Sequence, residues 1–330
     1  FSAHYKNFFE ESKNIQLIFN ANLLDLKLNN NKIKSIICSN YNHFVHEIKS
    51  KIFIFAMGGI ENSRFLLHFN EKYFQNNTMP IGNYWMDHPY HSVAEGILFK
   101  TNFNDYLIKN NLKEIIKTKC DYSFYFSPNE NYLKKQNLIN TSINIGIFDP
   151  KENQNFFLKK LKCVAPNILH NKLLRNSDDG HYDVTINILS DQKPSFENKV
   201  TLSNNLDALG MPLTNLYWKR SELIRYSSRK IMEDLATFFV KENLGRLALK
   251  EFLFSNNNFT HENGYHHMGG TRMGNNVKNS VVNSNLKVHN TKNLFTCGSS
   301  VFVSAGHAYP TLTLIQLSIR LADHISKLIK

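Results

Sequence analysis

A unit made of an apolar strand, a turn of small residues and a helix occurs twice in this chain. One copy covers residues 52–67 and has Gly58-Gly59 at its turn; the other covers residues 294–329 and has Gly298-Ser299-Ser300 there. Strands that are apolar along their whole length are typical of parallel sheets that are covered by helices. Together the two units predict an α/β fold with a buried parallel sheet.

Turns of this kind can bind a nucleotide-type ligand, because they present backbone N–H groups and the positive end of a helix dipole to a phosphate or an electron-rich ring. The usual dinucleotide fingerprint is nevertheless absent. None of the 14 glycines is followed by another glycine two positions later, so the chain contains no G-x-G-x-x-G turn. From the residues alone, ordinary connections of an α/β fold remain the alternative.

The rest of the chain indicates further strands and helices. Asn-rich turns, of which 29–31 is the clearest, separate predicted strands at 15–19, 23–28, 33–38 and 44–48. From about residue 90 to 203, strand-like runs alternate with polar connections and a predicted helix at 156–175. Residues 221–249 have the spacing of an amphipathic helix, interrupted near Gly245.

Length and composition exclude several classes of protein. The chain has 330 residues, 42% of them hydrophobic, which is enough for one large or two ordinary folded domains. No apolar run approaches the roughly 20 residues of a membrane span. The net charge is +12, and the lysines that contribute to it are dispersed along the sequence. We therefore predict a generally basic surface and no nucleic-acid partner. The four cysteines lack C-x-x-C spacing, which argues against a metal site or a disulfide framework.

The glycine-rich stretch 266–274 contains the best candidate for a catalytic side chain. It begins with His266-His267, and an imidazole that titrates near neutrality suits a general base. We select His267 as this base, with a structural histidine as the alternative. The segment Asp87-His88-Pro89, by contrast, is typical of a turn next to a buried aromatic residue. No G-x-S-x-G elbow occurs, so nothing indicates a serine hydrolase.

Four stretches together resemble the glucose–methanol–choline (GMC) family of flavin oxidoreductases. In order they are residues 56–67, 82–89, 266–274 and 297–313. The resemblance runs from about residue 15 to the end and implies FAD as the cofactor. It also implies an α/β (α+β) architecture in which an incomplete FAD-binding Rossmann-like domain is interleaved with a substrate domain. We place the Rossmann-like parts at 1–90 and 261–330, and the substrate domain, a β-sheet plus helices, at 91–260.

The resemblance further implies roles for individual residues. His267 would take the proton from a substrate hydroxyl while hydride passes to the flavin, which oxidises the CH–OH group of an alcohol or sugar. The residues implied at the cofactor are Ala56, Gly58, Gly59, Glu61, Asn62, Gly298, Ser299, Pro310 and Thr311. The electron acceptor stays open between oxygen, a quinone and a haem protein.

Two departures from the family pattern matter. The second catalytic residue of the family, His or Asn, stands directly before Pro-Thr, and here that position is Tyr309; His307 is the other candidate. The N-terminal glycine fingerprint has no counterpart, and the chain starts at Phe1 without a signal pattern. We interpret it as the C-terminal portion of a longer enzyme, favour a cytoplasmic location, and expect weak or no FAD binding by residues 1–330. The alternative function is a degenerate module that binds a glycan or partner without flavin.

Overall fold

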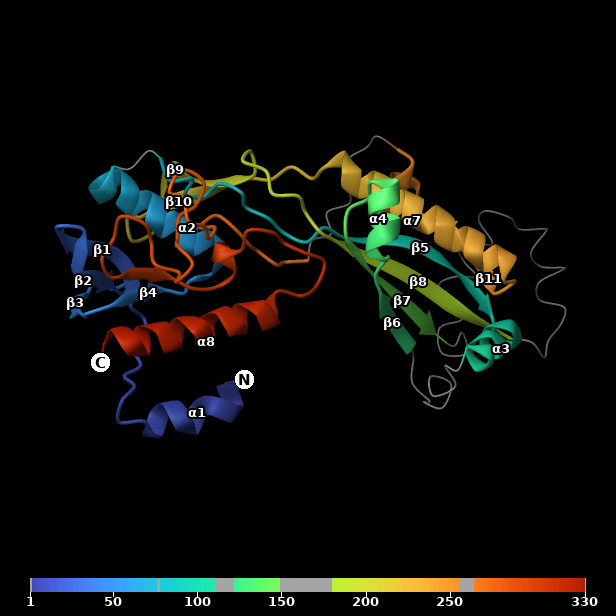
Figure 1. Ribbon diagram of the computed structural model, residues 1–330. Coiled ribbons are helices and arrows are strands. Elements are labelled where there is room, and N and C mark those ends of the chain that lie inside the picture. Colours follow the sequence, from blue (N-terminus) through green and yellow to red (C-terminus); the bar gives the residue numbers. More distant parts are fainter. Residues whose placement is uncertain (1, 76–77, 111–121, 149–179, 256–263, 330) are drawn as a thin grey trace.

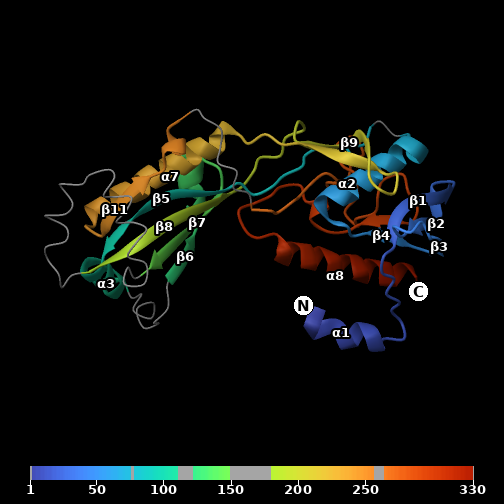
Figure 2. The same ribbon diagram turned by 180° about the vertical axis from the view of Figure 1, so that it is seen from behind.

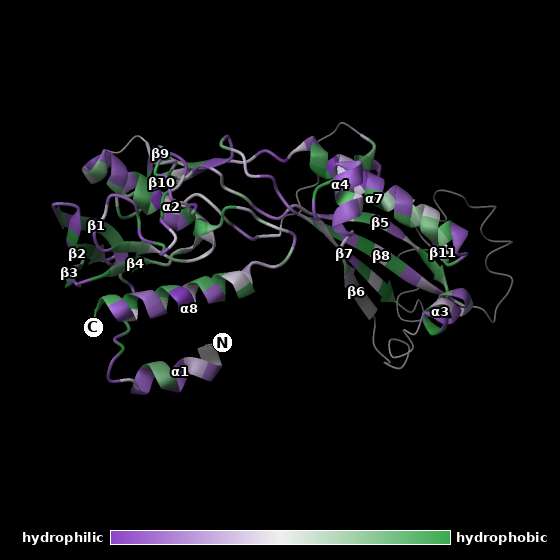
Figure 3. Cartoon of the chain, in the orientation of Figure 1, coloured by the Kyte–Doolittle hydropathy of each residue, from purple (hydrophilic) through white to green (hydrophobic). Residues whose placement is uncertain are grey.

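The computed structural model describes residues 2–75, 78–110, 122–148, 180–255 and 264–329, and these form two lobes (Figures 1 and 2). The lobe at the left of Figure 1 holds both strand–turn–helix units, and the lobe at the right is built on one larger sheet. Figure 3 shows apolar residues along the strands of both lobes. Among the helices that are described, none is long and apolar enough to cross a membrane.

The strands of the two repeated units pair directly in the first lobe. β4 (Phe53–Phe55) and β12 (Leu294–Thr296) are parallel neighbours. α2 (Gly58–Phe69) follows β4, and two of its phenylalanine rings pack against Phe55 in the core of this lobe. The side chain of Ile54 is 47% exposed, so β4 is covered on one face only. The prediction of a fully buried strand was therefore wrong for this residue.

Antiparallel strands and further helices complete the first lobe. One sheet has the order β1-β2-β3, and β9 pairs with β10 in a hairpin beside α2. The bounds are β1 (Asn22–Asn29), β2 (Lys32–Ser39), β3 (Val45–Lys49), β9 (Lys199–Leu206) and β10 (Pro212–Tyr217). The helical elements are α1 (Ser2–Glu11), η1 (Asn70–Phe74), η4 (Ser299–Val301) and α8 (Thr311–Leu328).

The second lobe is an antiparallel sheet in the order β11-β5-β8-β7-β6. Its strands are β5 (Tyr90–Phe99), β6 (Tyr122–Phe126), β7 (Thr141–Phe148), β8 (His181–Ser190) and β11 (Gly245–Leu249). The helical elements are α3 (Lys100–Lys109), α4 (Glu130–Gln136), α7 (Glu222–Lys241) and η3 (Glu251–Leu253). Alternate side chains of β7 and β8, such as Ile143 and Ile186, form a core with Ile231 of α7. The opposite face of these strands is therefore free to carry polar residues.

Most of the predicted strands and helices are confirmed, and two are not. Residues 15–19 form no strand and expose their apolar side chains. The predicted helix over 221–249 ends at Lys241, and residues 245–249 form the edge strand β11 instead. Asn243 adopts φ of +50°, which ends the helix, and Gly245 then packs so closely on Ile97 that a Cβ would lie 2.0 Å from its carbonyl oxygen. The helix predicted at 156–175 lies outside the described residues.

Candidate functional site

The two small-residue turns lie side by side and are joined by one side chain. The Asn62 carboxamide accepts the N–H of Met57 at 3.0 Å and donates to the carbonyl oxygen of Cys297 at 3.0 Å and to Ser300 Oγ at 2.9 Å. Asn62 is fully buried. The parallel pairing of β4 with β12 brings both turns to the same sheet edge, and Asn62 fixes their separation.

The glycines of these turns border open space. Gly58 and Gly298 have φ of +92° and +111°, and a Cβ added to either would meet no atom within 4 Å. Gly59 is different, because a Cβ there would lie 2.7 Å from the backbone oxygen of His267. Gly58 and Gly298 therefore leave room for a ligand, at the N-terminus of α2 where backbone N–H groups favour an anion. Gly59 instead permits close packing of the His267 backbone.

The other residues predicted at the cofactor belong to the same two strand–turn–helix units. Ala56 is exposed at the end of β4, and Glu61 forms an ion pair with Arg64 at 3.2 Å. The hydroxyl of Ser299 donates to the backbone oxygen of His267 at 2.6 Å. Pro310 and Thr311 lie at the N-terminus of α8, where Thr311 is exposed. These positions are compatible with the predicted roles, which remain predictions.

A cluster around His266 lies at the junction of the two lobes. Nδ1 of His266 is 2.9 Å from Nδ1 of His88, and Nε2 of His88 is 3.3 Å from the carbonyl oxygen of Ala305. A single carboxylate oxygen of Asp87 accepts the backbone N–H groups of both histidines at 2.7 Å. The ring of Tyr309 packs edge-on against the ring of His266, with centroids 5.1 Å apart.

These contacts assign the protons of both rings. The carbonyl oxygen of Ala305 can only accept, so His88 carries its proton on Nε2 and leaves Nδ1 bare. That bare nitrogen accepts the Nδ1 proton of His266, which leaves Nε2 of His266 without a proton. Burial lowers the pKa of His88 and also that of His266, which is less deeply buried. Both rings are therefore neutral at pH 7, and His266 Nε2 is a lone-pair base.

The two histidines that the sequence predicted as catalytic, His267 and His307, have other contacts. The ring of His267 packs against Trp85, with centroids 5.4 Å apart, and its backbone joins the two turns. His307 lies near the half-buried carboxyl of Asp191, which also accepts the N–H of Gly306. Of the three predicted catalytic residues, Tyr309 is the one that contacts His266.

Sequence reasoning did not bring Asp87, His88 and His266 together. The signal was a pair of polar residues directly after the aromatic segment 82–86, and both prove to be buried. A buried Asp-His pair is hydrogen-bonded, so it needs a partner elsewhere in the fold. That partner, His266, lies 178 residues along the chain from His88. Among the described residues, no group of His, Cys, Asp and Glu could hold a metal ion.

A further histidine near this cluster predicts acid sensitivity. Burial, and then the positive charges of Arg220 and Arg225, lower the pKa of His91 from 6.5 to about 4. The unfolded chain therefore binds this proton first, and stability that is full above pH 6.5 is lost as the pH falls towards 4. The expected loss is about 3 kcal/mol.

Urea unfolding at several pH values checks this expectation. His91→Gln should reduce the loss of stability between pH 6.5 and 4, whereas His46→Gln, which removes an exposed histidine from β3, should leave the pH dependence as it is. An unchanged pH dependence in His91→Gln would contradict the assignment.

Comparison with known proteins identifies related enzymes. Residues 194–318 match the family model for GMC oxidoreductase. The fructose dehydrogenase large subunit of Gluconobacter japonicus is 26% identical over 291 residues, which cover 85% of this chain and 48% of that protein. The 2-methyl-1,2-propanediol dehydrogenase of Mycolicibacterium austroafricanum is 27% identical over 163 residues, 48% of this chain and 27% of that protein. The chain thus spans half or less of the curated relatives that it matches, and its resemblance to GMC oxidoreductases is confirmed.

Solved structures share the fold. A formate oxidase of Aspergillus oryzae RIB40, studied for its FAD modification, has a TM-score of 0.56 at 15% identity; the match covers 97% of this chain and 62% of that one. The pyridoxine 4-oxidase of Mesorbium loti has a TM-score of 0.54 at 12% identity and covers 94% of this chain and 58% of that one. The predicted α/β (α+β) class is confirmed. The domain boundaries remain predictions.

Proposed function

We propose that this chain, which has a GMC oxidoreductase segment at residues 194–318, is the part of an FAD-dependent oxidoreductase that oxidises the CH–OH group of an alcohol or sugar. The names of two relatives, a fructose dehydrogenase subunit and a propanediol dehydrogenase, support this substrate class. The observation that carries the proposal is the bare Nε2 of His266 beside Tyr309, at the junction of the lobes.

The residues present fit FAD on two sides. Gly58 and Gly298 leave open space at the N-terminus of α2, where backbone N–H groups can hold the pyrophosphate. The N-terminus of α8, at Pro310 and Thr311, can stabilise negative charge on the flavin ring. When bound, FAD supplies the hydride acceptor for the reaction.

His266 supplies the proton transfer. Its Nε2 takes the proton of the substrate hydroxyl. The two hydrogen bonds that join Ala305, His88 and His266 leave that nitrogen without a proton and hold the ring in place. Removal of this proton raises the electron density on oxygen and weakens the adjacent C–H bond. The Tyr309 ring packs edge-on against His266. Tyr309 therefore lies beside the proposed base. This arrangement supports the catalytic function over a degenerate binding module, and it favours His266 over His267 as the base.

Substrate-dependent flavin reduction tests the proposed function. The chain is mixed with FAD in excess, because we expect weak retention of the cofactor, and a neutral sugar or polyol is added without oxygen. We expect the flavin absorbance to disappear faster than with free FAD and the same substrate. Binding of FAD and of substrate without any reduction would contradict the redox function and favour the binding module.

A further inference from the structure

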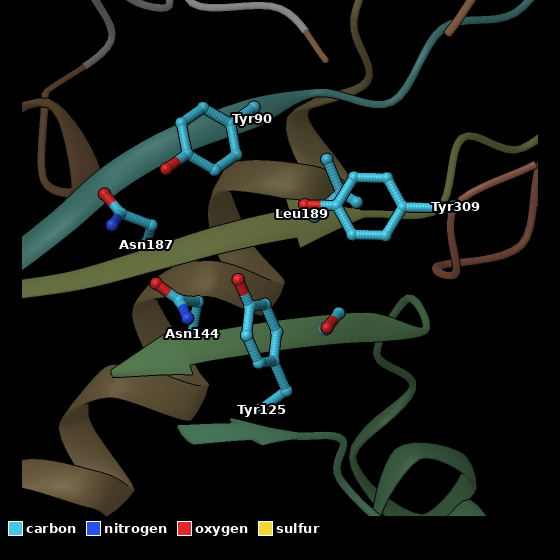
Figure 4. A pocket seen from close by; sticks show the side chains of 7 residues that line it. Tyr90, Tyr125, Asn144, Asn187, Leu189 and Tyr309 are labelled. Carbon is cyan, nitrogen blue, oxygen red and sulfur yellow. The ribbon is translucent and has the colours of Figure 1, made fainter. Parts of the chain in front are cut away.

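A small pocket lies on the face of the second-lobe sheet that points away from α7 (Figure 4). Its lining residues are Tyr90, Tyr125, Ser142, Asn144, Asn187, Leu189 and Tyr309. They come from four neighbouring strands and from the loop that carries Tyr309. Its volume is about 40 Å³, and a water-sized group needs about 10–15 Å³, so it admits about three such groups.

Strand register assembles this pocket. Asn144 of β7 stands opposite Asn187 of β8 and, on its other side, opposite Tyr125 of β6. One row further along, Leu189 stands opposite Ser142 and Tyr90. Because side chains alternate along a strand, the intervening isoleucines face α7 and these residues share the other face.

The pocket is polar but uncharged. Amide and hydroxyl groups of the described lining residues both donate and accept hydrogen bonds, as the hydroxyl groups of a polyol do. Three tyrosine rings and Leu189 offer apolar surface to the C–H groups of such a ligand. No lysine, arginine or acidic residue is among them, so an ionised ligand would lose its hydration without gaining a counter-charge.

We propose that this pocket binds the neutral, polyhydroxylated end of the substrate, with Asn144 and Asn187 as specificity-determining residues. Tyr309 links it to the proposed base, since its ring lines the pocket and packs against His266. The proposal rests on the proposed function, which places the reacting CH–OH group of the substrate at His266. It narrows the substrate class to neutral polyols and sugars and excludes carboxylates.

Calorimetric binding of D-sorbitol and D-gluconate tests the proposal, because the two ligands match in size but differ in charge. The full chain is measured with and without FAD. We expect D-sorbitol to bind about tenfold more tightly than D-gluconate, and Asn187→Leu to weaken D-sorbitol about tenfold. Asn204→Leu, which changes an exposed residue of β9, should leave both affinities unchanged. If Asn187→Leu does not fold, Asn187→Ala removes the carboxamide without adding bulk and is expected to weaken D-sorbitol too.

The outcomes separate this proposal from the proposed function. D-Sorbitol binding that depends on Asn187, without flavin reduction, would support the pocket and contradict the redox function. Flavin reduction that is unaffected by Asn187→Leu, or equal affinity for the two ligands, would overturn the pocket proposal alone.

Discussion

The variant His266→Asn is expected to reduce flavin at a rate about 10²–10⁴-fold lower than the unmodified chain, because it removes the proposed proton acceptor. His267→Asn is the matched control, since it changes the adjacent residue of the same loop. The His267 ring packs against Trp85, whereas His266 contacts His88 and Tyr309. His267→Asn should therefore lose far less activity than His266→Asn. The rates are measured without oxygen at saturating FAD and substrate.

A second measurement checks the proton assignment without any turnover. Nitrogen–proton NMR spectra of the unliganded chain should show His266 protonated on Nδ1 and His88 protonated on Nε2 at neutral pH. His88→Phe should change the tautomer of His266, because it removes the acceptor of the Nδ1 proton.

A loss of activity in His267→Asn with full activity in His266→Asn would instead support His267 as the base, the residue selected from the sequence.

The choice between two adjacent histidines shows the limit of local patterns. The stretch 266–274 is recognisable because its residue types and order are unusual. Which imidazole contacts His88 and Tyr309 depends on Asp87, whose carboxylate accepts the backbone N–H of His266 from 179 residues away. Tyr265 also adopts φ of +56°, which sets the direction in which the chain enters the loop. Neither constraint is visible in the spacing of the motif.

The elements of the fold were likewise predictable only where their sequence signals are local. The strand–turn–helix units were predictable because their signals are local: apolar runs, glycines and helical spacing. β11 was not, because pairing with β5 overrides the helical spacing of residues 245–249. The pocket residues Tyr125, Asn144 and Asn187 were not singled out either, because strand register alone makes them neighbours.

Replacement of Asn62 is expected to have a large effect on stability. Asn62→Ala leaves the carbonyl oxygen of Cys297 without its partner in a buried setting and the N–H of Met57 without its partner in a half-buried one. Unsatisfied buried groups of this kind cost about 1–3 kcal/mol each, so we expect a loss of about 3 kcal/mol in the free energy of unfolding. Urea unfolding measures the loss, and Asn204→Ala, which changes an exposed residue of β9, is the control.

The same variant separates two roles for Asn62. As a residue that joins the turns, its loss should lower stability without FAD present and weaken FAD binding as a consequence, because Gly58 and Gly298 no longer hold their separation. As a direct cofactor ligand, its loss should weaken FAD binding while the stability of the unliganded chain stays as it is. The three hydrogen bonds within the protein occupy both the oxygen and the nitrogen of the carboxamide, so we expect the first result.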